Sequence, residues 1–421
     1  MVAGVFRQEW GRITAALIHQ TGDWDLAEEC AQDAFAQALR RWPGDGVPDR
    51  PGAWLMTVAR RRALDRLRRG RTYQAKLEEL AVTAAREQDP NAVAAPDQDA
   101  DAGDGGVPDG RLRLIFTCCH PALALEARVA LTLRTLTGLS TAEIARAFLV
   151  PEATMAKRLV RAKQKIAHAR IPYRVPPASA LPERVPGVLA VLYLVFNEGY
   201  AASGGDDVIR RDLCDQAITL TRVLTELLPA EPEAQGLLAL MLFHRARQAA
   251  RVDARGDLVT LEDQDRTRWD QAEADLARRH LATALAARRP GQYQLQAAIA
   301  GCHAAARTAD ATDWPRIARL YRHLAELTGS PVVELNRAVA VSMADGPAAG
   351  LALLTRLEAG GALAGYYLLP ATRADLLRRL GRDGEAADAY QEAAALAATG
   401  PERRFLEARL AQITGSATNG G

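Results

Sequence analysis

Apolar residues recur at intervals of three and four along most of this chain, which is the spacing of amphipathic helices. Residues 5–40 follow this pattern, with a break predicted over TGDWD at 21–25. A second helix is predicted from 53 to 69, and the helical pattern resumes over 111–170. From residue 187 onward one predicted helix follows another. The pattern therefore predicts an all-α protein.

Three stretches interrupt the helical pattern. RRWPGDGVPDRPG at 40–52 contains three prolines and three glycines and is predicted to be a loop. Between 72 and 110 acidic residues outnumber basic ones nine to two, which is typical of a flexible linker. IPYRVPPASALPERVP at 171–186 contains five prolines, which indicates a further boundary. The interruptions divide the chain into four predicted parts, 1–72, 73–110, 111–171 and 172–421.

A repeat signal lies near the C-terminal end. RRLGRDGEAADAYQEAAAL at 378–396 has the spacing of a tetratricopeptide helix pair, and residues 335–354 repeat it weakly. In such a pair small residues let two helices approach, and a tyrosine fills the gap between them. The residues at this spacing are Gly381, Ala386, Tyr390 and Ala393. Two imperfect repeats suggest an α-solenoid, and the irregular stretch 251–270 is predicted to hold a small hairpin around Arg255–Gly256.

Composition fits a folded soluble protein, with 48% hydrophobic and 25% charged residues, and the net charge of +2 does not by itself indicate a nucleic-acid binder. The five cysteines are widely spread, so reduced thiols in the cytoplasm are expected rather than disulfides. Glu9 and Arg12 interrupt the early apolar residues, which argues against a signal peptide. The longest apolar run, at 187–196, is about half a membrane span. We therefore expect a cytoplasmic protein with no membrane contact.

The stretch LSTAEIARAFLVPEATMAKRLVRAKQKI at 139–166 predicts a helix-turn-helix unit. Ser140 and Glu143 have the spacing of a capping box at the start of a first helix. Pro151 suits the start of a second helix, and FLV makes the short turn between them. The second helix carries an apolar stripe at steps of four, three and four, formed by Met155, Leu159, Ala162 and Ile166.

The opposite and flanking faces of that second helix are basic. We interpret its N-terminal residues as reading base edges in the major groove and its cations as binding phosphates. The candidate base-reading residues are Glu152, Ala153 and Thr154. The candidate phosphate-binding residues are Lys157, Arg158, Arg161 and Lys165. The alternative is a solvated basic helix with no ligand.

A second basic block follows the proline-rich loop. It comprises Arg60, Arg61, Arg62, Arg66, Arg68 and Arg69. Trp42 and Trp54 flank the loop, so they could stack on an unstacked base while the arginines contact the strand. The alternative for both tryptophans is a place in the core.

Together these segments resemble the extracytoplasmic-function sigma factors of bacterial RNA polymerase. LAEECAQDAFAQAL at 26–39 and AWLMTVARRRALDRLRR at 53–69 match sigma region 2, and residues 138–166 match sigma region 4. FTCCHPAL at 116–123 and the long C-terminal extension resemble the subgroup with tetratricopeptide-like C-terminal domains.

The resemblance implies a non-catalytic subunit that binds the β and β′ subunits of core RNA polymerase and promoter DNA, with no cofactor. It assigns the −35 element to the helix from Glu152 and the −10 element to the Trp/Arg module. It places polymerase contacts at Glu28, Glu29, Gln32, Asp33 and Phe35. Many members have Asn where this chain has Arg61, which leaves the detailed −10 contacts open. The extension is expected to bind regions 2 or 4, core polymerase or another protein.

Two other residue groups resemble catalytic or metal sites. Cys118, Cys119 and His120 lack the spacing of zinc ligands and are expected to pack in a helix and end it. A polar set in the extension lacks a nucleophile or metal set, so we expect caps and buried hydrogen bonds, with a ligand pocket as the alternative. Its members are Asn197, Glu198, Asp263, Asp265 and His303. No catalytic residue and no metal site is predicted. The rival functions are a helical-repeat scaffold and an operator-binding regulator without polymerase contacts.

Overall fold

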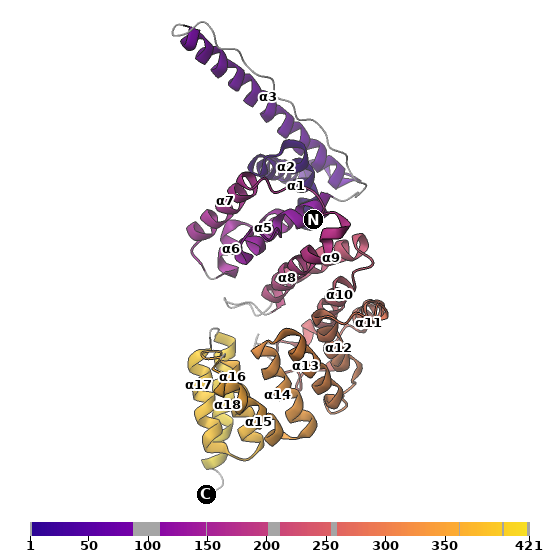
Figure 1. The fold of residues 1–421 in the computed structure, drawn as a ribbon, viewed down its shortest axis with the longest axis vertical. Helices are drawn as coiled ribbons and strands as arrows, with labels where there is room; N and C mark the ends of the chain where they lie inside the picture. The colour runs from indigo at the N-terminus through magenta and orange to yellow at the C-terminus, as the bar shows by residue number, and fades with distance from the viewer. Residues whose placement is uncertain are drawn as a thin grey trace. The chain divides into compact units, whose positions relative to one another are not determined.

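The computed structural model describes residues 2–86, 110–148, 150–200, 211–253, 259–361, 363–397 and 400–418. It forms two compact units, the first made of Met1–Ile144 with Pro151–Val188 and the second of Ala145–Val150 with Leu189–Gly421. Over the described ranges the extended regular elements are all helices (Figure 1), which confirms the predicted all-α class.

The first unit contains the helices up to the division inside α8, except for the last residues of α6. They are α1 (Val2–Thr21), α2 (Trp24–Asp45), α3 (Pro51–Arg86), α4 (Gly110–Cys118), α5 (Leu125–Thr137), α6 (Thr141–Ala147), α7 (Glu152–His168), the 3-10 turn η1 (Ala178–Ala180) and α8 (Leu181–Tyr200). The break between α1 and α2 falls where it was predicted. Gly22 there has a φ of +67°, and the Asp23 side chain accepts hydrogen bonds from two backbone N–H groups of α2.

Two boundaries differ from the sequence-based prediction. Helix α2 continues through Pro43 to Asp45, because Trp42 is buried against Trp54 and packing overrides the loop-like composition. Helix α3 continues to Arg86, well into the predicted linker. The residues over 72–86 include Leu, Glu, Lys and Ala, which favour helix, whereas most of the acidic residues come later. Residues 87–109 of the predicted linker lie outside the described residues.

An aromatic cluster forms part of the core of the first unit. The rings of Phe6 and Phe35 meet edge to face with centroids 4.8 Å apart, and Trp10 lies 5.0 Å from Phe6. Gly138, with a φ of +74°, ends α5 against the same cluster. A Cβ at this position would come within 2.7 Å of the Phe6 ring, so no larger residue fits without a shift.

The second unit continues with helices that pack on their neighbours in sequence. They are α9 (Arg211–Leu227), α10 (Pro232–Ala246), the turns η2 (Gln248–Ala250) and η3 (Arg266–Arg268), α11 (Gln271–Ala286), α12 (Gln292–Ala305), α13 (Trp314–Thr328), α14 (Pro331–Asp345), α15 (Pro347–Ala359), α16 (Leu368–Arg379), α17 (Asp383–Leu396) and α18 (Gly400–Thr418). The backbone N–H of Val259 donates to the carbonyl of Arg251, as a hairpin would require. The predicted turn at Arg255–Gly256 lies outside the described residues.

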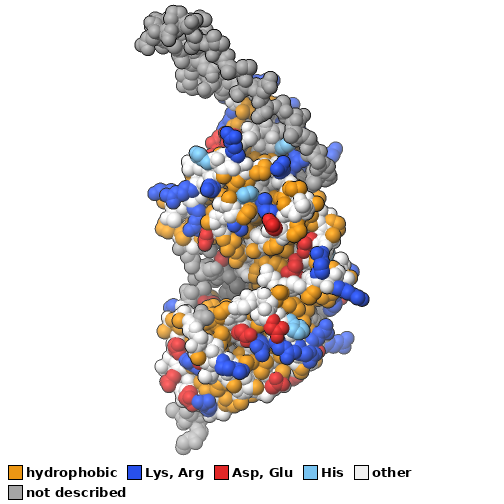
Figure 2. All heavy atoms as spheres, viewed as in Figure 1, with side chains coloured by type: hydrophobic (Ala, Val, Ile, Leu, Met, Phe, Trp, Pro, Cys, Tyr) orange, Lys and Arg blue, Asp and Glu red, His pale blue; other side chains and the backbone are white. Residues whose placement is uncertain are grey.

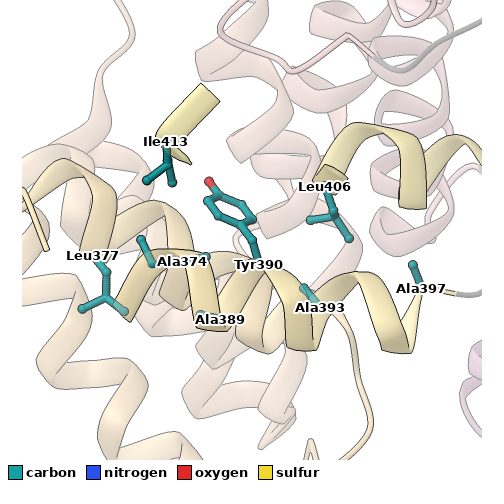
Figure 3. Packing of buried hydrophobic residues seen from close by; sticks show 9 residues of the cluster. Ala374, Leu377, Ala389, Tyr390, Ala393, Ala397, Leu406 and Ile413 are labelled. Carbon is teal, nitrogen blue, oxygen red and sulfur yellow. The ribbon is translucent and has the colours of Figure 1, made fainter. Parts of the chain in front are cut away.

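Helices α16 and α17 pack as the predicted helix pair, and α18 packs on α17 in turn. Tyr390 on α17 is buried and lies among side chains of α16 and α18, including Leu406 and Ile413 (Figure 3). The fully buried Ala386 and Ala393 let the neighbouring helices approach. In the weaker repeat, a Cβ on Gly350 of α15 would come within 2.7 Å of a backbone carbonyl of α14, so close approach there also depends on a small residue.

The segment Ala178–Tyr200 is long and apolar enough to cross a membrane by length and composition alone, with a mean hydropathy of 1.4. This differs from the expectation based on residues 187–196. Val191, Leu192, Val195 and Phe196 are fully buried in the protein, so the segment equally fits a core helix of a folded domain. By itself it is weak evidence for a membrane span.

Candidate nucleic-acid interface

The capping box at the start of α6 forms as predicted. The N–H of Glu143 donates to the Ser140 hydroxyl oxygen at 3.2 Å. In return the Glu143 carboxylate accepts from the N–H of Ser140 at 2.7 Å and from its hydroxyl at 2.6 Å. These bonds satisfy backbone donors that the first turn of a helix leaves without partners. Leu149, in the predicted turn, lies outside the described residues.

Helix α7 separates an apolar face from a polar one. The predicted stripe is confirmed, since Met155, Leu159, Ala162 and Ile166 are all buried. Of the candidate DNA-contacting residues, Arg158 is half-buried and the others are exposed, namely Glu152, Ala153, Thr154, Lys157, Arg161 and Lys165. Figure 2 shows Lys and Arg side chains projecting from the surface over α7. The structure therefore brings the candidate DNA-reading residues onto one accessible helix.

The exposed cations of α7 are regularly spaced. Lys157, Arg161 and Lys165 follow one another at steps of four, so they form a single stripe along the helix. None of the three makes an ion pair with any residue in the described part of the chain. Their charges are therefore available to a polyanion.

The basic block on α3 divides into inward and outward arginines. Arg66 binds the carboxylates of Glu29 and Asp33 on α2, and Arg62 lies 3.8 Å from Asp33. The side chains of the other four point to solvent and are Arg60, Arg61, Arg68 and Arg69. Two of the six candidate −10 arginines thus already hold α3 against α2.

The two tryptophans of the candidate −10 site touch each other. Their ring centroids are 5.5 Å apart in an edge-to-face arrangement. Trp42 is only 5% exposed, whereas Trp54 is half-buried. In this structure Trp42 belongs to the core, and Trp54 is the one of the two with accessible ring surface.

The candidate polymerase-binding residues on α2 are split between surface and interior. Glu29 and Gln32 are exposed and Asp33 is partly so. Phe35 is buried in the aromatic cluster. Glu28 is also buried, with 6% of its side chain exposed. Two of the five positions are therefore covered by the rest of the first unit.

Glu28 is held by two cations that sequence reasoning did not identify. Its Oε2 accepts a hydrogen bond from Nε of Arg134 on α5 at 3.0 Å. Its Oε1 lies 3.1 Å from Nζ of Lys163 on α7, as an ion pair without the alignment of a hydrogen bond. Lys163 also binds Asp25 at 2.7 Å. The available signal was Arg134 itself, the one charged residue in the apolar stretch 129–139.

The cysteines behave as packing residues. All five are buried and free, and the thiols of Cys118 and Cys119 lie beside the hydroxyls of Thr135 and Thr132 at 3.3 and 3.7 Å. Burial raises the pKa of Cys119 to about 12, so its thiol stays protonated near neutral pH. Among the described residues no group of three or more His, Cys, Asp or Glu could hold a metal ion.

The polar set proposed for the extension is not assembled into one site. The Asp265 side chain accepts from the N–H of Thr267 in η3, and Asp263 accepts from the Thr260 hydroxyl at 2.6 Å. Both carboxylates are exposed. His303 instead lines a cavity inside the second unit. A cap is therefore confirmed for Asp265, whereas Asp263 accepts a side-chain hydrogen bond in a turn and His303 has a different setting.

Comparison with known families divides the chain into three matched parts. Residues 5–72 match the model for sigma-70 region 2, and residues 113–166 match sigma-70 region 4. Residues 184–285 match a family of unknown function (DUF6596). The first two matches cover the two modules that carry the basic helices α3 and α7.

Two relatives extend this comparison. The "Uncharacterized protein R00370" of Rhizobium meliloti (strain 1021) is 44% identical over 396 residues, which are 94% of this chain and 92% of the relative. The "Probable ECF RNA polymerase sigma factor SigI" of Mycobacterium tuberculosis (strain ATCC 25618 / H37Rv) is 27% identical over 177 residues, which are 42% of this chain and 58% of the relative. No solved structure gives a significant match to this chain.

Proposed function

Since the chain belongs to the extracytoplasmic-function group of the sigma-70 family and carries an additional helical domain after region 4, we propose that it directs core RNA polymerase to promoters through two separate DNA contacts. The polymerase supplies the chemistry of RNA synthesis, and this chain acts without catalysis of its own. Such a role places the protein in the cytoplasm, with the β and β′ subunits and promoter DNA as partners.

The observation that carries the proposal is the outward face of α7. Short residues stand at its exposed N-terminus, where Glu152 can accept from a cytosine amino group and Thr154 can contact a thymine methyl. Behind them, Lys157, Arg161 and Lys165 form a stripe of cations that make no ion pair with any described residue. This division between base-reading tip and phosphate-binding flank supports duplex recognition at the −35 element.

The second DNA contact involves α3. Arg60, Arg61 and Arg69 are exposed, and Trp54 keeps accessible ring surface next to them in sequence. Aromatic faces and arginines together bind single-stranded nucleic acid, because the bases stack while the cations neutralise phosphates. These features support a role of α3 at the opened −10 element, with Trp54 rather than Trp42 as the aromatic contact.

Binding of polymerase to α2 at Glu28 requires other residues of this chain to move away first. Glu28 is enclosed by Arg134 of α5 and Lys163 of α7, which belong to the part of the chain matching region 4. A polymerase surface that binds Glu28 must therefore replace these two cations. We infer that docking of α2 on core polymerase separates α7 from α2 and thereby frees the −35 helix to move to its own DNA site.

Run-off transcription tests the proposal directly. Full-length protein and core polymerase are incubated with pooled fragments of host upstream DNA, and the transcripts are sequenced. We expect transcripts from a small set of fragments with the protein present and none of these with core enzyme alone. Substitution of Arg161 by Ala should reduce them, whereas Arg307→Ala, which removes an exposed arginine of the second unit, should not. Folded protein that yields no added transcript from any fragment contradicts the proposal.

A further inference from the structure

A cavity of 180 Å³ lies inside the second unit, among residues of α10, α12, α13 and α14. Part of its wall is apolar and is formed by residues such as Phe243, Ile299 and Leu324. An engineered protein cavity of about 150 Å³ holds a benzene molecule, so this one has room for a small ring or a short hydrocarbon chain. Its polar wall is formed by His244, Arg247, Gln296, His303, Tyr321 and Asn336.

The charge at this cavity is positive, and no carboxylate of the described residues pairs with it. Arg247 lies in the wall, and its guanidinium donates to Nδ1 of His244 at 2.9 Å. His244 must therefore carry its proton on Nε2. Burial lowers the pKa of His244 well below its usual value and that of His303 to about 4, so both imidazoles are neutral near pH 7. Arg247 makes no ion pair with any carboxylate of the described ranges.

Arg266 adds a second fixed cation next to the cavity. Its guanidinium donates to the backbone carbonyls of His303 at 2.7 Å and Ala306 at 2.9 Å, and lies 4.9 Å from the ring centroid of Trp269. No carboxylate in the described part of the chain pairs with it. Both arginines are partly buried, and partly buried cations that no carboxylate neutralises are costly, so proteins ordinarily compensate them.

Several buried nitrogens around the cavity also lack a hydrogen-bond partner within the described protein. They are Nε of Arg266, Nε1 of Trp269 and Nδ1 of His303. The first two can only donate, and the third can donate in one tautomer. Trp269 and His303 both line the cavity. Because buried donors are nearly always satisfied in folded proteins, the group missing here is an acceptor.

We propose that this cavity binds a small organic monocarboxylate. Its carboxylate accepts from Arg247 and from the unpartnered donors beside it, and its hydrocarbon part packs on Phe243, Ile299 and Leu324. The volume and the apolar wall favour a carboxylate with a small ring or chain over inorganic phosphate. The site lies wholly within the second unit, so the inference does not depend on the promoter function.

Calorimetric titration of the full-length protein at pH 7 tests this. Benzoate and hexanoate are the probes. Benzamide serves as a neutral analogue of benzoate, and inorganic phosphate serves as an anion that has no hydrocarbon part. We expect saturable binding of at least one carboxylate and no binding of benzamide or phosphate. Arg247→Gln should weaken the binding about ten- to a hundredfold, because charge-assisted hydrogen bonds are lost. Arg222→Gln, which changes an exposed arginine of α9, should leave affinity unchanged.

A second variant covers the case in which Arg247→Gln does not fold. Ala300 lines the cavity and carries no charge, so Ala300→Leu fills the space and should abolish carboxylate binding. The proposal is overturned if neither carboxylate binds the parent protein at millimolar concentration, or if benzamide binds as tightly as benzoate. It is equally overturned if phosphate alone binds, or if a folded Ala300→Leu protein binds as tightly as the parent.

Discussion

Each of the two units has a site that encloses charged groups, and among the described residues only the site in the first unit pairs cations with a carboxylate. In the first unit Glu28 lies between Arg134 and Lys163, so its carboxylate meets two cations. In the second unit Arg247 and Arg266 lie beside neutral histidines and meet no carboxylate of the described residues. The balanced site joins three helices, whereas the unbalanced one surrounds a cavity. The difference indicates that the first holds the fold together and the second is completed by a ligand.

Replacing Glu28 by Gln gives the largest effect expected from this comparison. It leaves Arg134 and Lys163 beside a neutral group in a largely buried place, where breaking an ion pair costs about 3–5 kcal/mol. Amide hydrogen exchange of α2 and α5, followed by mass spectrometry, should then be about a hundredfold to a few thousandfold faster.

Glu29→Gln is the matched control for that variant. Glu29 is also on α2 and also binds an arginine, Arg66, but 59% of its side chain is exposed. Exposed pairs contribute about 0–1 kcal/mol, so exchange should change little. If the two substitutions accelerated exchange equally, burial would not explain the importance of the Glu28 ion pairs, and the contrast with an exposed pair would be wrong.

Lowering the pH should destabilise the second unit through the site that contains Arg247, Arg266 and His303. Burial and the nearby Arg247 and Arg266 lower the pKa of folded His303 to about 4, while an unfolded histidine titrates near 6.5. Between these values the unfolded chain binds the extra proton, so the second unit loses stability as the pH falls from about 6.5 to 4. The loss reaches up to about 3 kcal/mol at the lower end.

Amide hydrogen exchange in α12 and α13 across this pH range measures the loss of stability of the second unit. His303→Gln, which cannot take up the proton, should show a weaker pH dependence. Saturating benzoate should also weaken it if the cavity binds carboxylates, because a bound anion favours the charged imidazole. A His303→Gln protein with the pH profile of the parent would show that this histidine does not carry the effect.

The features that sequence could predict are those encoded by local spacing. The stripe from Met155 to Ile166, the capping box at Ser140 and the packing of Tyr390 all follow from residues a few positions apart. Helix ends were harder, because composition suggested a loop where Trp42 is held by packing. Neither enclosed charge site could be predicted in full. Glu28 meets a cation 106 positions away, and no local pattern relates such residues.

The smallest expected effect concerns helix α7, which carries one cation that is paired inside the first unit and one that is exposed to solvent. Lys163 is compensated by Asp25 and Glu28, whereas Arg161 is exposed and has no partner among the described residues. If DNA supplies the missing charge, Arg161→Ala should reduce the slope of log affinity against log salt by about one for the lost phosphate contact. Lys163→Gln should leave that slope unchanged, although it weakens the Glu28 site. Fluorescence anisotropy with promoter duplex over a salt series measures both slopes, and an unchanged slope for Arg161→Ala would mean that this side of α7 does not face DNA.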